Sequence, residues 1–389
     1  MTAGVRIPAA LLALTLLLTG CSSAGPWFGG KEKPEDEKVQ DYVEPKPGQP
    51  VGLKQLWRTG VAGSPDEYFF HPRTIGLTGE AVYMATRDGQ VTALSRPEGD
   101  TLWETDLDAP VAGGVAVDET RVYVGTLDGD MVALHRADGK PAWRVPVSSS
   151  VASAPQVAAG KVIFLTLDNR TYALDAASGE RLWVHTTPPE SLVVMGAATP
   201  TVSGRMVLVG YSSGEVFALA LDSGQRIWST NLTVLGKRSE LDLLQDVDAP
   251  VVAGEGRFYA VNHQGRLVAL QPSKGTFLWE RSLSAVRRPL LADNRLYVSD
   301  VDGSLTALGT EDGIPLWTTR LSDGLLTAPV MYRGRIVVGD SKGRLFAVDP
   351  TSGRVLGLDH LGDDLFSDPV VDGNNLFLWT NDGNTYRFE

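Results

Sequence analysis

Cysteine is almost absent from this chain. Cys21 is the only cysteine among 389 residues, so a disulfide within the chain is excluded. Histidine is scarce as well, and the five histidines are scattered along the sequence, at His71, His135, His185, His263 and His360. Zinc sites draw on closely spaced cysteines and histidines. We therefore expect no metal site.

Long apolar runs are also missing, except at the N-terminus. Residues 7–18 form an apolar run that is too short to span a bilayer as a mature helix and has the size of a signal-peptide core. The run ends in Leu18-Thr19-Gly20-Cys21, which resembles the bacterial lipobox, where the thiol is lipidated and the chain is cut before Cys21. The alternative is an ordinary secretory signal with a chance cysteine. We expect residues 1–20 to be a cleaved lipoprotein signal peptide.

Basic residues are outnumbered by acidic ones. Lys and Arg number 35 against 47 Asp and Glu, so the formal net charge is −12. This acidity argues against binding to nucleic acid and against electrostatic adhesion to anionic lipid. Membrane attachment is therefore expected only through the lipid on Cys21, where several acyl chains, palmitate among them, exceed the marginal binding of a single chain.

The segment after the cysteine resembles a spacer. Residues 21–50 combine Gly, Pro and mixed charge with few apolar residues, which predicts a flexible tether with a reach of roughly 30 Å. Ser22 stands where an aspartate would favour retention at the inner membrane, so the sequence resembles an outer-membrane address. We expect a lipid-anchored protein of the bacterial outer membrane that faces the periplasm.

Glycine is abundant and marks an internal repeat. A two-residue turn recurs eight times, at Asp88-Gly89, Asp128-Gly129, Asp168-Asn169, Ser213-Gly214, Gln264-Gly265, Asp302-Gly303, Lys342-Gly343 and Asp382-Gly383. The spacing of 38 to 51 residues is typical of β-propeller blades rather than of helical solenoids. Short apolar runs flank the turns, as expected for β-hairpins. A proline opens each unit, where a strand loses no ladder donor.

Six units also carry a tryptophan four residues after a second glycine, and Trp57 stands at the matching position of the N-terminal strand. These residues are Trp57, Trp103, Trp143, Trp183, Trp228, Trp279 and Trp317. We interpret them as structural wedges between blades, because a site for aromatic stacking of a ligand would not need the same residue in every blade. Gly357 takes the tryptophan position in the seventh unit, which predicts a weaker outer contact there.

The last unit is incomplete. A tryptophan strand is due after Asp382-Gly383, but the sequence ends at Glu389. Residues 53–58 match the fourth-strand pattern of residues 179–184 and precede the first full unit. We expect this N-terminal strand to pair with the C-terminal blade and close the ring, which removes an exposed sheet edge. The prediction is an all-β, eight-bladed propeller of residues 51–389, with four antiparallel strands per blade.

Two links between blades are longer than the others. From the tryptophan to the next proline they measure 17 residues (183 to 200) and 22 residues (228 to 250), against 7 to 15 elsewhere. In a four-stranded blade these links emerge on the same face as the turns. Both long links carry apolar residues, which surface loops seldom do without a reason. They predict a local lid over the ring or a protein-docking patch with an acidic rim.

The combination of repeat, closure, lipobox, tether and a loop ending in Asp246-Val247-Asp248 resembles the BamB family, the propeller lipoproteins of the outer-membrane β-barrel assembly machine. The repeat alone is shared with pyrroloquinoline-quinone dehydrogenases. The resemblance covers nearly the whole chain. It implies a non-catalytic scaffold that docks a BamA-like β-barrel insertase through a periplasmic POTRA domain and assists unfolded outer-membrane protein clients.

The resemblance assigns partner binding to five loop positions by motif. They are Leu192, Val194, Met195, Asp246 and Asp248. Met195 stands where the enterobacterial sequence has arginine, so the polar contact of that position is in doubt. The apolar pattern of the second link adds Leu241, Leu243 and Leu244 as further candidates.

An enzyme is the main alternative. Residues 210–214 fit the letters of a G-x-S-x-G nucleophile elbow, but that motif requires a strand–turn–helix context, and here it falls on a hairpin turn. A quinone-dependent dehydrogenase is expected to have adjacent cysteines and a calcium-binding acidic set, whereas Cys21 is assigned to lipid. A periplasmic propeller that binds a ligand in its channel stays open. We expect no catalytic residue and no cofactor.

Overall fold

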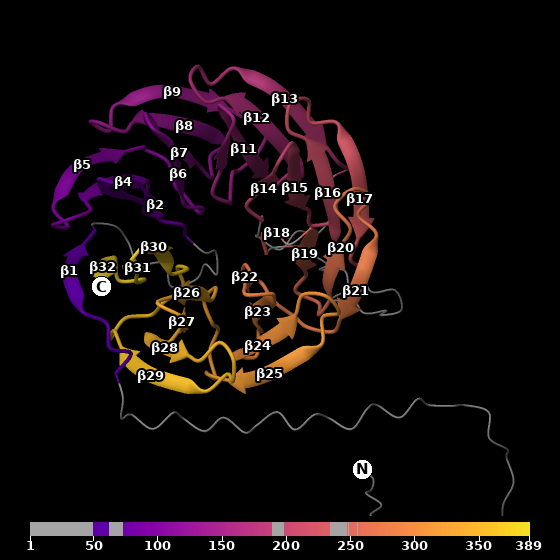
Figure 1. Ribbon diagram of the computed structural model, residues 1–389. Helices are drawn as coiled ribbons and strands as arrows, with labels where there is room; N and C mark the ends of the chain where they lie inside the picture. Colours follow the sequence, from indigo (N-terminus) through magenta and orange to yellow (C-terminus); the bar gives the residue numbers. More distant parts are fainter. Residues whose placement is uncertain (1–49, 62–72, 189–197, 234–246, 248, 255) are drawn as a thin grey trace, which may run out of the picture. The chain divides into compact units, whose positions relative to one another are not determined.

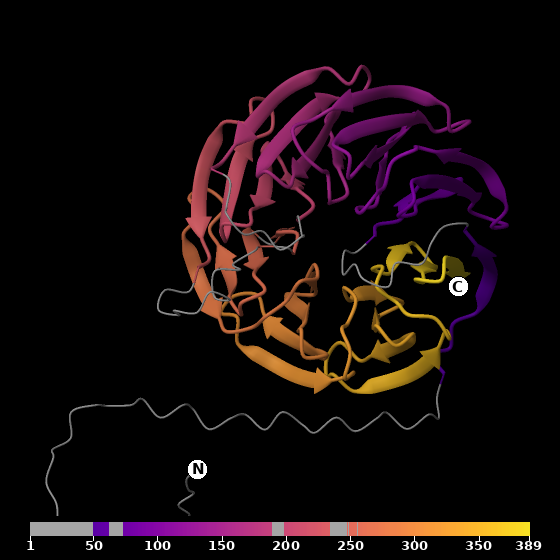
Figure 2. The same ribbon diagram turned by 180° about the vertical axis from the view of Figure 1, so that it is seen from behind.

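The computed structural model describes residues 50–61, 73–188, 198–233, 247, 249–254 and 256–389. These residues form thirty-two strands and no helix, and so contain no helix able to cross a membrane. The strands make eight four-stranded antiparallel sheets arranged as the blades of a ring (Figures 1 and 2). The predicted eight-bladed propeller is therefore confirmed.

The strands follow one another from the centre of the ring to its rim in each blade (Figure 1). Blade 1 contains β2 (Gly76–Leu77), β3 (Ala81–Ala85), β4 (Gln90–Ser95) and β5 (Thr101–Asp106); blade 2 contains β6 (Val115–Val117), β7 (Arg121–Gly125), β8 (Asp130–His135) and β9 (Pro141–Pro146); blade 3 contains β10 (Gln156–Ala158), β11 (Lys161–Thr166), β12 (Arg170–Asp175) and β13 (Arg181–Thr186); blade 4 contains β14 (Thr201–Ser203), β15 (Met206–Gly210), β16 (Glu215–Ala220) and β17 (Arg226–Asn231).

The second half of the ring repeats this order. Blade 5 contains β18 (Val252–Gly254), β19 (Arg257–Val261), β20 (Leu267–Leu270) and β21 (Phe277–Arg281); blade 6 contains β22 (Leu290–Ala292), β23 (Arg295–Ser299), β24 (Ser304–Gly309) and β25 (Pro315–Arg320); blade 7 contains β26 (Val330–Tyr332), β27 (Arg335–Gly339), β28 (Arg344–Val348) and β29 (Val355–His360); blade 8 contains β30 (Val370–Asp372), β31 (Asn375–Trp379), β32 (Asn384–Phe388) and β1 (Gln55–Gly60).

Blade 8 closes the ring as predicted. Strand β1 pairs antiparallel with β32, with Trp57 opposite Arg387 and Thr59 opposite Thr385. Lys54 and Glu389 extend the pairing, because each backbone N–H donates to the carbonyl of the other, at 2.9 and 2.8 Å. The first and last strands of the domain thus share one sheet, and no open array of blades is left.

The hydrophobic core is divided among the junctions between blades. Eight clusters of buried residues occur, and each draws its side chains from two neighbouring sheets. Blades 1 and 2, for example, share Tyr83, Val91, Val124 and Leu134. Burial of apolar area stabilises such contacts by about 25 cal/mol per Å². The stability of each blade therefore depends on its neighbours.

The tryptophans lie at these junctions, at the rim of the ring. Trp103 shows the arrangement: its Nε1–H donates to the Arg136 carbonyl of the next blade at 2.9 Å, and its ring packs against Gly139. A Cβ atom on Gly139 would stand 2.5 Å from Trp103 Cε3, and Gly139 has a φ of +70°. All seven tryptophans donate to the following blade, through Arg96, Arg136, Ala176, Leu221, Pro272, Thr310 and Pro350 in ring order.

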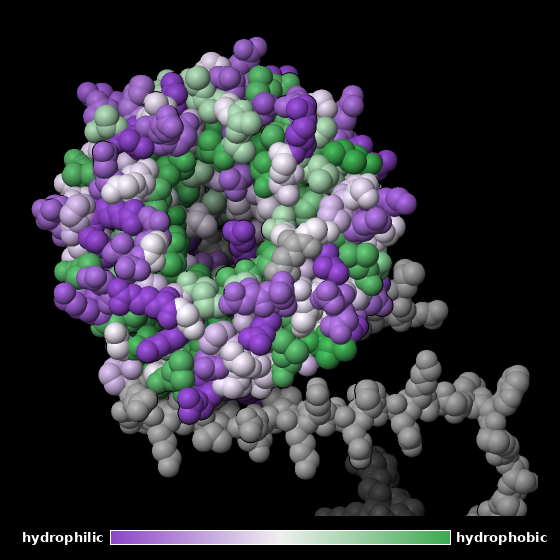
Figure 3. All heavy atoms as spheres, in the orientation of Figure 1, coloured by the Kyte–Doolittle hydropathy of each residue, from purple (hydrophilic) through white to green (hydrophobic). Residues whose placement is uncertain are grey.

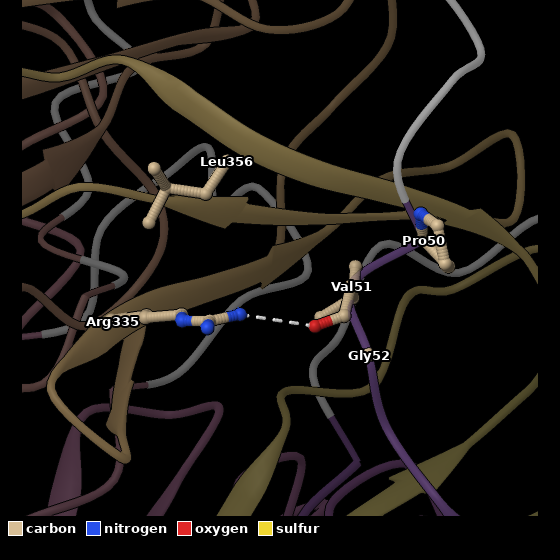
Figure 4. A pocket seen from close by; sticks show the side chains of 5 residues that line it. All are labelled: Pro50, Val51, Gly52, Arg335 and Leu356. Carbon is tan, nitrogen blue, oxygen red and sulfur yellow. Dashed lines mark hydrogen bonds between the residues drawn. The ribbon is translucent and has the colours of Figure 1, made fainter.

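The junction of blades 7 and 8 uses a different contact. A Cβ atom on Gly357 would lie 2.7 Å from the Pro50 carbonyl oxygen and 2.8 Å from Val51 Cα, so the incoming backbone occupies the place of an indole. Arg335 Nη1 donates to the Val51 carbonyl at 3.2 Å beside a pocket of about 400 Å³ (Figure 4). Backbone packing and a guanidinium hydrogen bond thus replace the indole contact expected to be missing here.

A glycine-to-alanine substitution tests the junction. Gly139→Ala adds a left-handed alanine, which costs about 1–2 kcal/mol, and overpacking against Trp103, which costs about 1–3 kcal/mol. Gly160→Ala is the matched control, because Gly160 has a φ of +72° and no atom within 4 Å of an added Cβ. We expect denaturant unfolding to show a larger loss for Gly139→Ala. Equal losses would contradict the packing account.

Candidate docking face

The eight turns and the described starts of the links between blades lie on one face, which we call the link face. The N–H of the first link residue donates to the carbonyl of the turn glycine in most blades, as in Leu107 to Gly89 at 3.0 Å, Leu232 to Gly214 at 2.8 Å and Leu321 to Gly303 at 3.0 Å. These bonds place links and turns together, as the strand count predicts. In the orientation of Figure 1, the ring has a hollow at its centre, and hydrophobic and hydrophilic residues are intermixed around it (Figure 3).

The predicted partner-binding residues lie outside the described residues. Leu192, Val194 and Met195 fall within 189–197, and Leu241, Leu243, Leu244, Asp246 and Asp248 fall within 234–246 and at 248. Cys21 falls within 1–49. Their roles stay predictions, and the described residues around them show how the two long links are attached to the ring.

The longer link is attached at both ends. At its start Leu232 is fully buried and hydrogen-bonded to blade 4 through Gly214. At its end Val247 is 2% exposed, and its Cγ1 would lie 2.6 Å from a Cβ added to Gly210. Leu232 and Val247 share the cluster between blades 4 and 5. Val247 therefore anchors the chain between the two candidate aspartates.

The other long link, which follows blade 3, begins beside the turns of blades 3 and 4. Thr187 Oγ1 donates to the Asn169 carbonyl at 3.1 Å, and the Ser212 hydroxyl donates to Asn169 Oδ1 at 3.0 Å. Tyr211 and Thr171 share a buried hydroxyl hydrogen bond of 2.6 Å, and burial raises the pKa of Tyr211. The turns of blades 3 and 4 are thus tied together, and both long links start from this base.

These contacts also account for the apparent esterase motif. Strand β15 ends at Gly210 and β16 begins at Glu215, so the motif occupies a hairpin turn. Ser212 joins two blades through Asn169, which is a structural role. Within the ranges that the structure describes, no group of three or more His, Cys, Asp or Glu residues is arranged to hold a metal ion.

Acidic groups crowd the link face near blades 7 and 8. A hydrogen bond with Asp363 raises the pKa of Asp382, and burial together with the charges of Asp363 and Asp364 adds to the effect. Burial, followed by the charges of Asp340 and Asp363, raises the pKa of Asp364. Neighbouring negative charges therefore disfavour ionisation, and a cationic partner surface would relieve this repulsion.

Asp300 in blade 6 has an unusual environment that sequence reasoning missed. Burial, reinforced by the Asp302 carboxylate, raises the pKa of Asp300 to about 6, although the backbone N–H groups of Val301, Asp302 and Ser284 oppose the shift. The sequence feature that could have identified Asp300 is an aspartate two residues before the turn Asp302-Gly303. Among the eight turns, only blades 6 and 7 have an aspartate there; the others have threonine, tyrosine or asparagine.

The raised pKa makes stability depend on pH. The folded state holds the Asp300 proton more tightly than the unfolded chain, whose ordinary value is 3.8, so stability falls as the pH rises from about 4 through 6. Asp300→Asn removes this loss. We expect its free energy of unfolding to exceed that of the wild type by about 1–2 kcal/mol at pH 8, allowing for partial exposure. Thermal melts at pH 4 should show no such gain, and a pH-independent difference would contradict the assignment.

Comparison with known proteins places this geometry in context. The family model for "Outer membrane protein assembly factor BamB" matches residues 87–292 and 264–389. The BamB protein of Pseudomonas aeruginosa is 44% identical over 327 residues, covering 83% of each chain. The BamB protein of Legionella pneumophila is 38% identical over 331 residues, covering 84% of each chain.

Solved structures show the same architecture. The crystal structure of BamB from Moraxella catarrhalis superposes with a TM-score of 0.78 at 24% identity, covering 87% of this chain and 99% of that one. Quinohemoprotein alcohol dehydrogenase from Comamonas testosteroni superposes with a TM-score of 0.65 at 15% identity, covering 86% of this chain and 76% of that one. At such identities the likeness concerns the fold alone.

Proposed function

The chain belongs to the BamB family of outer-membrane protein assembly factors, and on that premise we propose that its link face docks the periplasmic POTRA region of a BamA-like insertase. The protein is a non-catalytic scaffold of the outer-membrane β-barrel assembly complex. Cys21 carries the lipid that holds it at the outer membrane, facing the periplasm. Docking fixes the orientation of the partner's periplasmic arm while unfolded outer-membrane protein clients are assembled.

The observation that carries this proposal is the common base of the two long links. The turns of blades 3 and 4 are joined through Asn169, and the second link is pinned by Leu232 and Val247 at the junction of blades 4 and 5. A preorganised base lowers the conformational cost of binding. Apolar residues at Leu192 and Val194 would supply the buried contact, with Asp246 and Asp248 at its rim.

Charge on this face supports the same partner chemistry. The formal net charge of the whole chain is −12, and the crowded carboxylates of blades 7 and 8 add negative potential to that part of the link face. Acidic rims contribute mainly to the rate of encounter and to specificity. The partner surface is accordingly expected to be basic around an apolar centre.

A double substitution tests the docking proposal. Leu192→Arg combined with Asp246→Arg is expected to weaken binding to the soluble POTRA domains of the BamA homologue at least tenfold, because it removes an apolar anchor and reverses a rim charge. Calorimetry measures the affinity, and thermal melting checks the fold.

The matched control is Leu316→Arg combined with Glu311→Arg, which places the same changes on exposed residues away from the link face. It should leave the affinity unchanged. If the link-face variant unfolds instead, the links act as a lid. If it stays folded and binds normally, the docking surface lies elsewhere.

A further inference from the structure

The turns of blades 6 and 7 have matching backbones, which allows a direct comparison of their side chains. In blade 7 the N–H of Asp340 donates to the Arg344 carbonyl at 2.9 Å; in blade 6 the N–H of Asp300 donates to the Ser304 carbonyl at 2.8 Å. The strand registers agree, with Gly339 opposite Leu345 and Ser299 opposite Leu305. Ser304 therefore occupies the position of Arg344.

In blade 7 the buried carboxylate is neutralised within the chain. Asp340 is fully buried, and Arg344 donates to its Oδ2 from Nε at 2.7 Å. The same guanidinium reaches Ser322 Oγ at 2.7 Å and Asp323 at 3.1 Å. Lys342 completes the set by pairing with Asp323 at 2.6 Å. Two acidic and two basic side chains thus balance one another.

Blade 6 lacks every cation of this set. Ser304 replaces Arg344, Asp302 replaces Lys342, and Ala285 stands at the link position of Asp323. Ser304 is 3% exposed, and its hydroxyl has no hydrogen-bond partner among the residues that the structure describes. Described lysines and arginines form no ion pair with Asp300, whose neighbouring charge is another carboxylate. Two negative charges and an unpaired hydroxyl remain where blade 7 holds a guanidinium.

This turn adjoins the longer link through a chain of hydrogen bonds. Val301 N–H donates to the Ser284 carbonyl at 3.2 Å, and Ser284 Oγ donates to the His263 carbonyl in the turn of blade 5. Asn262 in that same turn donates from Nδ2 to the Leu232 carbonyl at 3.3 Å. Leu232 begins the link that carries Asp246 and Asp248. The turn of blade 6 is therefore connected to the base of the proposed docking surface.

We propose that the turn of blade 6 receives an arginine side chain of the docking partner, held by the Asp300 carboxylate, the Asp302 carboxylate and the Ser304 hydroxyl. This inference rests on the proposed docking function. Arginine fits because the equivalent position in blade 7 is filled by the Arg344 guanidinium, which donates to a carboxylate and to a serine hydroxyl together. Carboxylate–guanidinium hydrogen bonds are stronger than neutral ones.

The free protein retains this carboxylate although its ionised form is destabilising. An internal arginine, as in blade 7, would remove the penalty, and so would an asparagine. Ionisable groups whose pKa is shifted far from the ordinary value are concentrated at functional sites. A partner's arginine would neutralise the turn only in the complex, so the same charge contributes to affinity and to specificity.

Two variants test this inference against the soluble POTRA domains of the BamA homologue. Asp300→Asn removes the acceptor charge and is expected to weaken binding at least tenfold. Ser304→Arg supplies an internal guanidinium, so it is expected to raise the melting temperature and to weaken binding similarly. Asp293→Asn is the control, because Asp293 is an exposed aspartate with a φ of 51° between β22 and β23, a conformation that asparagine accepts; its affinity should equal that of the wild type.

The outcomes separate this inference from the docking proposal. If the wild-type protein does not bind the POTRA domains, the docking proposal fails. If the wild type binds and Asp300→Asn binds equally well, the arginine site is overturned while docking stands. If added Ca²⁺ raises the melting temperature of the wild type but not of Asp300→Asn, and the partner's affinity is unchanged by the substitution, the turn is a metal site and the inference is wrong. The binding of Asp300→Asn alone decides whether the arginine site exists, even if Ser304→Arg does not fold.

Discussion

An indole that rests on a turn glycine and donates its N–H to a carbonyl of the next sheet joins seven of the eight pairs of neighbouring blades. The contact requires both partners, since only a residue without a Cβ admits the ring at that distance. It sets the spacing between sheets and thereby the volume that the apolar clusters fill. Because the ring is closed, the spacing between sheets also determines where each link is placed on the link face.

The eighth junction shows how the ring accommodates the chain ends. The turn that would supply the receiving glycine is missing in blade 8, because β32 and β1 come from opposite ends of the domain. Pro50 and Val51 fill the space at Gly357 instead. Pro50 thus lies beside blades 7 and 8, whereas the described starts of the two long links, Thr187 and Leu232, follow the last strands of blades 3 and 4.

The repeat made most of the fold predictable. Turn glycines, prolines and tryptophans recur at fixed intervals, so the number of blades and the closing strand at Trp57 follow from position alone. The contact that replaces the indole at Gly357 was not predictable, because it depends on where Pro50 arrives in space. Asp300 was missed for a related reason: its missing cation is evident only after the turns of blades 6 and 7 are compared residue by residue. The docking residues themselves rest on family resemblance, since they lie outside the described residues.

Partner binding is assigned to the link face, and the opposite face has no docking role. Site-specific photocrosslinking in intact outer membranes tests this division most directly, with the crosslinker placed at His263, exposed in the turn of blade 5, or at Lys274, exposed in the turn between β20 and β21 of the same blade. We expect an adduct with the BamA-like insertase from His263 and none from Lys274. An adduct from Lys274 alone, or none from either position, would contradict it.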